Sequence, residues 1–177
     1  MYSEKAIQNV DKNLSEGVYG YVLAKYVPRG FWDDLLVSDT AGIKTMNETS
    51  FNYSRCFTYS FFEDIQLQHN FYTVEATKEV IARGYLEYFD VRISAFGPYY
   101  YIDRGKYVPD GDSLELIDIS ECQNQVLEAK ILEVKTKLDQ AGQKEVDLNA
   151  LRIPLKKDIP LEDYEPDEIS YLSFLFD

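Results

Sequence analysis

The residues best suited to nucleophilic or acid–base catalysis are scarce in this sequence. It contains one histidine, His69, and two cysteines, Cys56 and Cys122. A serine or cysteine nucleophile needs a neighbouring base, and His69 is the only imidazole that could serve. Because His69 stands in the polar stretch 66–70, which is typical of a loop, we predict no catalytic residue. The sequence does not decide whether the protein is an enzyme, and it favours a non-enzymatic role.

The sequence also contains no recognisable metal-binding or cofactor-binding motif. Asp110 and Asp112 flank Gly111 as in a calcium loop, but Ser113 and Leu114 do not continue the ligand spacing. One histidine and two distant cysteines cannot form a zinc motif, and the glycines form no phosphate-binding loop. We therefore predict no metal and no cofactor, and we interpret 109–112 as a turn.

Acidic residues are in large excess. The 177 residues include 18 Lys and Arg against 31 Asp and Glu, so the formal net charge is -13 and the sequence pI is about 4.5. A negative field repels phosphate backbones and attracts a basic protein, which predicts a basic protein partner and no direct contact with nucleic acid. The alternative is that these charges only keep the protein soluble. Six acids and no base lie between positions 158 and 168: Asp158, Glu162, Asp163, Glu165, Asp167 and Glu168.

Tyrosine and phenylalanine are the second excess, with 15 Tyr and 10 Phe against one Trp. Tyr99, Tyr100 and Tyr101 are consecutive, so on a strand they point to both faces of a sheet. We expect at least one of the three hydroxyls to reach water, where tyrosine suits a protein interface. The alternative is that the rings fill the core. The predicted partner-binding residues are Tyr99, Tyr100, Tyr101, Glu162, Asp163 and Glu165.

Helical periodicity appears in three long segments. Apolar residues recur three and four positions apart in 4–16, 74–83 and 121–141. Thr73 and Gly84 have the character of caps for the second helix, and Ser120 with Gln123 resembles a capping box for the third. The region 28–50 is loop-like, with one helical turn predicted at 32–37.

Strand patterns alternate with these helices. Residues 18–27, 51–62 and 85–96 favour strands, and 99–102 and 106–108 flank a predicted loop at 103–105. A further strand at 114–119 follows the turn. Strands joined this tightly run antiparallel, so the prediction is an α+β fold with a mainly antiparallel, meandering sheet and two or three helices packed on one face.

The length favours a single domain over residues 1–177. In its last part, 146–177, prolines follow Ile153, Ile159 and Glu165, which predicts an extended C-terminal tail that wraps the domain. Residues 169–176 fit a helix or a strand equally well. Because the chain holds neither a long apolar run nor an N-terminal signal pattern, we expect a cytoplasmic protein that makes no contact with a membrane.

The first functional hypothesis is a binding module, an immunity- or antitoxin-like protein that captures a basic protein partner. The alternative is a structural or accessory subunit of a larger assembly, which would use the aromatic residues in a permanent contact. The third is an enzyme or small-ligand domain that works through carboxylates and tyrosines. Self-association into a homo-oligomer stays open.

Overall fold

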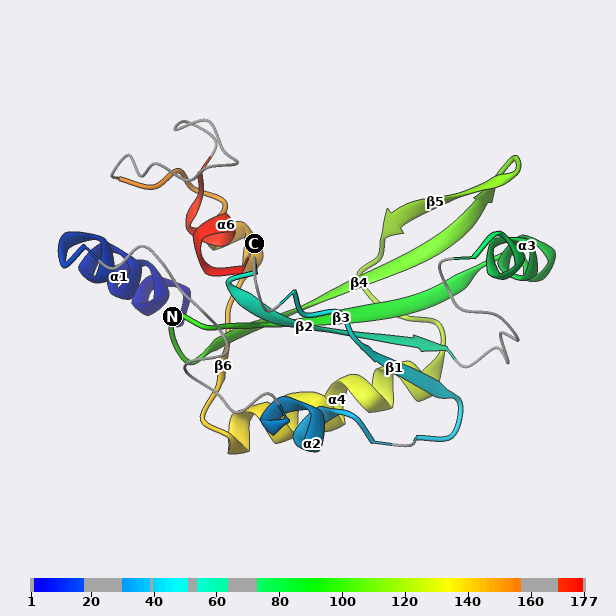
Figure 1. Cartoon of the computed structure of the whole chain (residues 1–177), viewed down its shortest axis with the longest axis horizontal. Helices are drawn as coiled ribbons and strands as arrows, with labels where there is room; N and C mark the ends of the chain where they lie inside the picture. Colours follow the sequence, from blue (N-terminus) through cyan, green and yellow to red (C-terminus); the bar gives the residue numbers. More distant parts are fainter. Residues whose placement is uncertain are drawn as a thin grey trace.

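A computed structural model describes residues 2–17, 30–38, 40–50, 54–63, 73–156 and 169–176. Its described strands form one open sheet in the order β1-β2-β3-β4-β5, with every neighbour antiparallel, and β6 pairs in parallel with the start of β4 (Figure 1). The predicted α+β class with a mainly antiparallel sheet is confirmed. The strands are β1 Ile43–Asn47, β2 Cys56–Glu63, β3 Leu86–Ser94, β4 Tyr99–Asp110, β5 Ser113–Asp118 and β6 Lys144–Glu145.

Helices lie against both faces of this sheet (Figure 1). α2 and α4 cover one face, whereas α1, α3 and α6 pack on the other. α3 has the predicted bounds and caps, because Thr73 Oγ1 accepts a hydrogen bond from the Ala76 N–H and Gly84 has a φ of 100°. The helices are α1 Tyr2–Ser15, α2 Phe31–Leu36, α3 Val74–Arg83, α4 Gln125–Gln140, α5 Leu148–Leu151 and α6 Tyr171–Phe176.

The largest core lies between the sheet and α4. The predicted apolar stripe of this helix is buried there and meets alternate residues of β2 and β3. Within it the rings of Phe61 and Phe89 are stacked with centroids 4.5 Å apart. Burial of each such side chain contributes roughly 1.5–3 kcal/mol, so this layer holds α4 on the sheet. The buried residues of the stripe are Leu127, Ile131, Val134 and Leu138, whereas Ala141, the last residue predicted for it, is the C-cap of α4 and is exposed.

The opposite face carries two separate apolar clusters. One joins α1, α5 and α6 to Cys56, Tyr99 and Tyr101, and the other joins Val80 of α3 to Phe62, Leu86 and Tyr88. The C-terminal helix is held by two hydrogen bonds to its carbonyls, from Ser94 Oγ to Leu175 at 2.9 Å and from Cys56 Sγ to Phe176 at 2.7 Å. The middle of this face, between the two clusters, is polar.

Several boundaries differ from the prediction. The prediction of a loop at 103–105 is wrong, because β4 runs unbroken from Tyr99 to Asp110. Gly105 is needed there for space rather than for a turn, since a Cβ at this position would collide with the ring and hydroxyl of Tyr88. α4 starts at Gln125 with Asn124 as its N-cap, so the capping box at Ser120 is also wrong.

The two short strands at the sheet edges were not predicted, and β1 occupies part of the region expected to be a loop. At 169–176, where helix and strand were equally favoured, residues 171–176 are helical. The strand predicted at 18–27 lies outside the described residues, as does 157–168 of the tail, and the single domain over 1–177 stays a prediction. No helix in the described part of the chain has the length and apolar character to cross a bilayer.

Candidate functional site

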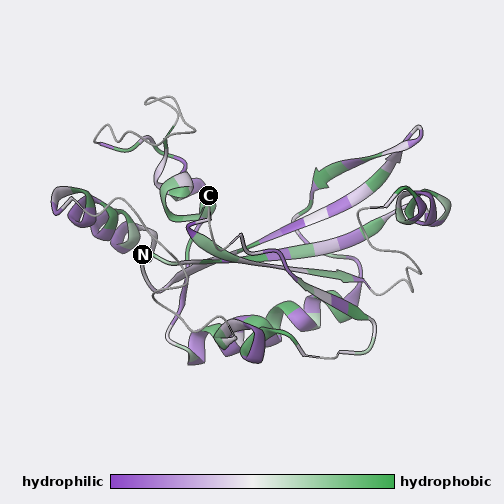
Figure 2. Cartoon of the chain, viewed as in Figure 1, coloured by the Kyte–Doolittle hydropathy of each residue, from purple (hydrophilic) through white to green (hydrophobic). Residues whose placement is uncertain are grey.

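Three polar residues lie side by side across the middle of the face that α4 does not cover. Strand register places Ser60 of β2 opposite Asp90 of β3, and Asp90 opposite Asp103 of β4, so the three side chains share one face. Figure 2 shows the corresponding hydrophilic stretch within β4. Like charges directly opposite on neighbouring strands destabilise a sheet, so the Asp90–Asp103 pair has an unfavourable local energy.

Asp90 has the most unusual environment of the three. Burial raises its pKa to about 6, and the hydrogen bond with Ser60 and the charge of Arg92 only partly oppose that effect. Its Oδ1 atom is buried and has no hydrogen-bond partner in the structure. A buried carboxylate oxygen without a donor is costly, and a cation or N–H donor brought to it from outside would remove that cost.

Two tyrosines, Tyr88 buried and Tyr107 half-buried, and two further carboxylates extend this group. Burial is the main cause that raises the pKa of Tyr88 and of Tyr107, and nearby carboxylates raise both further. Asp118 acts on Tyr88, and Glu48 acts on Tyr107 and Asp90. Carboxylates and phenol oxygens accept hydrogen bonds from Lys and Arg. We name this group the acidic face: Glu48, Asp90, Asp103 and Asp118, with Tyr88 and Tyr107.

A second concentration of charge lies at the start of α4, but it is closed. Glu63 and Glu87, from adjacent strands, are 4% and 1% exposed. Asn124 Nδ2 donates to Glu63 at 2.6 Å and its backbone N–H donates to Glu87 at 2.9 Å, while Arg83 lies 2.5 Å from Glu63. Lys106 lies 4.0 Å from Glu87. The two glutamates therefore anchor the N-terminus of α4 to the sheet, and their oxygens are already occupied.

The thiols do not have the character of nucleophiles. Burial, followed by the charges of Glu128 and Glu87, raises the pKa of Cys122 to about 12, so its thiol stays protonated at neutral pH. Cys56 is buried and donates its hydrogen to the Phe176 carbonyl. Neither cysteine forms a disulfide, and their positions are those of packed core residues.

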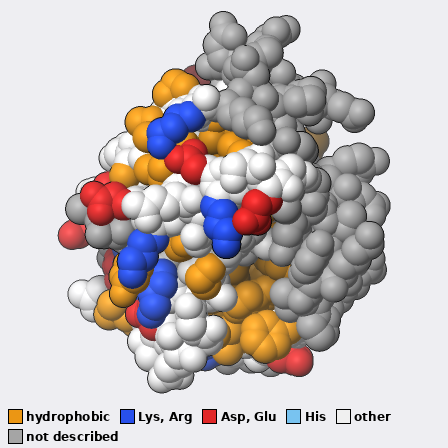
Figure 3. All heavy atoms as spheres, turned by 90° about the vertical axis from the view of Figure 1, so that its left-hand side faces the viewer, with side chains coloured by type: hydrophobic (Ala, Val, Ile, Leu, Met, Phe, Trp, Pro, Cys, Tyr) orange, Lys and Arg blue, Asp and Glu red, His pale blue; other side chains and the backbone are white. Residues whose placement is uncertain are grey.

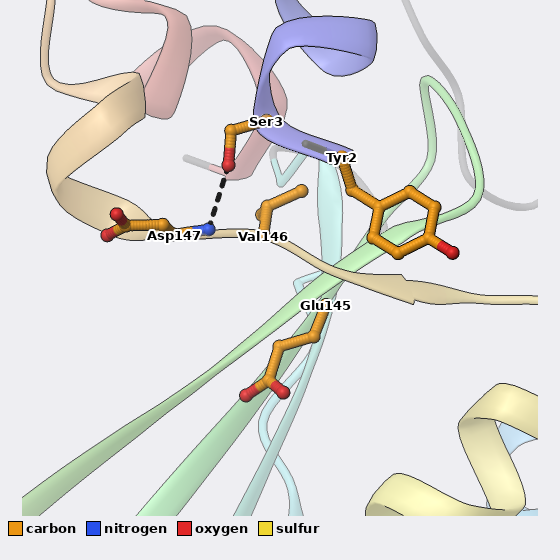
Figure 4. A pocket seen from close by; sticks show the side chains of 5 residues that line it. All are labelled: Tyr2, Ser3, Glu145, Val146 and Asp147. Atoms are coloured by element: carbon orange, nitrogen blue, oxygen red, sulfur yellow. Dashed lines mark hydrogen bonds between the residues drawn. The ribbon is translucent and has the colours of Figure 1, made fainter.

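A pocket of about 360 Å³ lies where the start of α1 meets β6 (Figure 4). Its two carboxylates do not act together, because Glu145 and Asp147 point away from each other. Glu145 pairs with Lys135 at 2.8 Å, and Asp147 caps α5 by accepting from the Asn149 N–H. Figure 3 shows acidic and basic side chains interspersed at the end of the molecule that carries α1, so the charge there is mixed.

The structure places the predicted tyrosines inside the protein. Tyr99, Tyr100 and Tyr101 are 4%, 1% and 6% exposed. They alternate between the faces as expected, with Tyr100 in the core under α4 and the other two in the cluster of α1 and α6. Tyr99 Oη accepts a hydrogen bond from Asn9 at 2.5 Å, and Tyr101 packs edge-on against Phe176. Little of their surface is left for a partner.

The described residues do not include the predicted acidic residues Glu162, Asp163 and Glu165, nor His69. Sequence reasoning missed the acidic face altogether. Its residues come from separate strands and meet only through strand register, and Asp103 falls within the loop predicted at 103–105.

Within the described ranges, no three His, Cys, Asp or Glu side chains gather in a way that could hold a metal ion. No protein-family model matches the chain, and comparisons with curated proteins and with solved structures found no significant similarity. Any functional interpretation therefore starts from the geometry of the acidic face.

Proposed function

We propose that this protein is a binding module whose acidic face receives cationic side chains of a basic protein partner, as an immunity- or antitoxin-like protein would. The observation that carries the proposal is the pair Asp90 and Asp103, opposite each other on neighbouring strands, with the Oδ1 of Asp90 buried and without a donor. An arrangement that costs stability in the free chain is expected where a ligand compensates it.

Charge over the whole chain supports the same interpretation. The net charge of -13 gives a long-range field that speeds the encounter with a basic protein, and salt weakens that field within a Debye length of about 10 Å at 0.1 M. The acidic stretch with Glu162, Asp163 and Glu165 belongs to the proposal as a second source of this field. The buried Tyr99, Tyr100 and Tyr101 contribute as scaffold, since they join the strands of the acidic face to both cores.

The test compares two double variants that remove the same charge. One is Asp90→Asn with Asp103→Asn, and the control is Asp34→Asn with Glu16→Gln, which neutralises exposed acids on helix α2 and just after α1. Each protein is immobilised and exposed to a native lysate at low salt, and the retained proteins are identified.

We expect the wild-type protein and the control to retain a basic protein that the acidic-face variant loses. The association rate of the purified pair should fall about tenfold between about 50 mM and about 300 mM salt, because steering by charge is screened. Retention of the same proteins by both double variants, or an association rate independent of salt, would contradict the proposal.

A further inference from the structure

Among the described strands, one edge of the sheet is left unpaired beside the acidic face. β5, Ser113–Asp118, is the last strand in the sheet order, and no described strand pairs with its outer edge. Backbone N–H and C=O groups on such an edge can form a ladder with an additional strand. In Figure 1 the hairpin of β4 and β5 extends away from the rest of the sheet.

Strand register shows which backbone groups face outward. The Ile119 N–H donates to the Arg104 carbonyl, and β4 and β5 pair with Lys106 opposite Ile117. In an antiparallel pair, alternate residues bond to the neighbour and those between them point away. Residues 113, 115 and 117 therefore bond to β4, whereas the N–H and C=O groups of Leu114, Leu116 and Asp118 point to the open edge.

The side chains of β5 are exposed to an unusual degree for a strand. Leu116 is 49% exposed and Ile117 is 37% exposed, and they lie on opposite faces of the sheet. An additional strand beside β5 would cover both residues. Exposed apolar side chains on an unpaired edge are a feature that proteins generally avoid unless a partner covers them.

The charge along this edge decides what kind of strand fits. Five acids and no base occur from Tyr107 to Glu121. Two copies of β5 paired edge to edge would bring their carboxylates together, which disfavours a homodimer. A segment with Lys or Arg at intervals along an extended backbone matches both the charge and the open hydrogen-bonding groups. The five acids are Asp110, Asp112, Glu115, Asp118 and Glu121.

A pocket of about 500 Å³ opens at the end of this edge, where the β4–β5 turn meets α3. Its wall on α3 is largely apolar, and Asp112 of the turn stands at its other side. The residues that line it are Val74, Thr77, Lys78, Ile81, Ala82 and Asp112.

We infer that the outer edge of β5 binds an extended cationic segment of the protein partner as an additional β-strand. This inference rests on the proposed function, because it takes the partner to be basic. It goes further in naming the mode of recognition: main-chain hydrogen bonds to Leu114, Leu116 and Asp118, with the cationic side chains of the segment set against the carboxylates of the edge and of the acidic face.

The substitution that tests the backbone contact is Leu116→Pro. It removes an N–H that points outward, so the β4–β5 ladder is retained, and proline is tolerated on an edge strand in this orientation. Leu116→Ala is the matched control, since it removes the same side chain and keeps the N–H. Amide NMR spectra of both variants establish that the fold is intact.

The probe is a capped ten-residue peptide of alternating Lys and Val, and the comparison peptide alternates Lys and Pro, with the same charge and no capacity to form a strand. We expect the Lys–Val peptide to shift the amide signals of Leu114, Leu116 and Asp118 and to slow their hydrogen exchange. Leu116→Pro should weaken its binding about tenfold relative to Leu116→Ala.

Equal binding of both peptides, or equal binding to both variants, would overturn strand addition. Dimerisation of the free chain through the same three amides would identify a second copy of the chain as the occupant of the edge. That result would also overturn the inference of a cationic partner segment. If Leu116→Pro retains a basic protein from the lysate that the acidic-face variant loses, the result supports the proposed function but contradicts strand addition at β5. If neither the wild-type protein nor the control captures a basic protein, the proposed function fails as well.

Discussion

Replacement of Asp90 by asparagine tests the physical account of the acidic face most directly. Asn has nearly the shape of Asp and keeps a group that can bond to Ser60, but it carries no charge. In the folded protein burial raises the pKa of Asp90 to about 6, and the charges of Glu48 and Asp103 add to that effect, whereas its ordinary value is 3.8. The ionised carboxylate is therefore less favourable in the folded chain than in the unfolded chain.

The direction of the pH effect follows from which state binds more protons. Between about pH 4 and pH 6 the folded chain holds a proton on Asp90 that the unfolded chain has released, so this group makes stability fall as pH rises through that range. A pKa of about 6 against 3.8 corresponds to about 3 kcal/mol at neutral pH, at 1.36 kcal/mol for each pH unit. Asp90→Asn should recover up to that amount.

The assay is urea unfolding of the wild-type protein and the variant at intervals from pH 4.5 to pH 7.5. The variant should be more stable by about 2–3 kcal/mol at pH 7.5. The difference should shrink to about 1 kcal/mol at pH 4.5, where Asp90 is protonated in the folded chain but largely ionised in the unfolded chain. Asp34→Asn, an exposed residue on α2, controls for net charge and should differ by less than about 0.5 kcal/mol. A variant no more stable than wild type at pH 7.5, or a difference independent of pH, would refute the reasoning.

Three further predictions concern the scaffold of the site. Asn124→Ala should destabilise the protein by about 3 kcal/mol in urea unfolding, because it removes the cap of α4 and a donor to a buried carboxylate. Gly105→Ala should cost about 2 kcal/mol, since the new Cβ would displace the buried ring of Tyr88, whereas Gly30→Ala has open space and should be nearly neutral by the same measurement. Cys122 should react with iodoacetamide at pH 8 only slowly in the folded protein and fully in urea, because burial raises its thiol pKa to about 12; fast modification without urea would contradict this.

The sequence predicts those elements of the fold whose signal is local. The helix at 74–83 carries its own cap residues, and the strands at 56–63 and 86–94 consist largely of β-branched and aromatic residues, so pattern alone identifies them. The boundary of α4 depended on a contact between distant residues, because Asn124 caps the helix while it also donates to Glu63 of β2. A local sequence pattern cannot predict a hydrogen bond between residues so far apart in the chain.

The loop predicted at 103–105 fails for the same reason. Asp, Arg and Gly in succession are typical of a turn, yet each has a place in the strand that is set by its neighbour across the sheet. Arg104 points toward α4 and pairs with Glu128 at 3.2 Å, and Gly105 leaves room for the ring of Tyr88. Asp103 stands opposite Asp90. Tertiary contacts therefore override the turn propensity at each of the three positions.

The acidic face could not be predicted for a further reason, which also bears on its function. The sequence directs attention to runs of like charge, whereas Asp90, Asp103 and Asp118 are separated along the chain and assemble only through strand register. Asp103 and Asp118 are exposed, as solubilising charges are, whereas Asp90 is partly buried. Burial of Asp90 is not expected of a charge whose only role is solubility.

Asp90 distinguishes a binding role from a merely structural one, because the two roles predict opposite signs for a single substitution. If Asp90 supported the fold, Asp90→Asn would lower stability and binding together. If it holds a cation of the partner, the same change should raise the stability of the free chain and weaken the complex, as at sites where function opposes stability. Proton release on binding near pH 6 should accompany the wild-type complex and be absent from the variant, since a cation beside Asp90 favours its ionised form. Calorimetry in two buffers of different ionisation enthalpy measures that release.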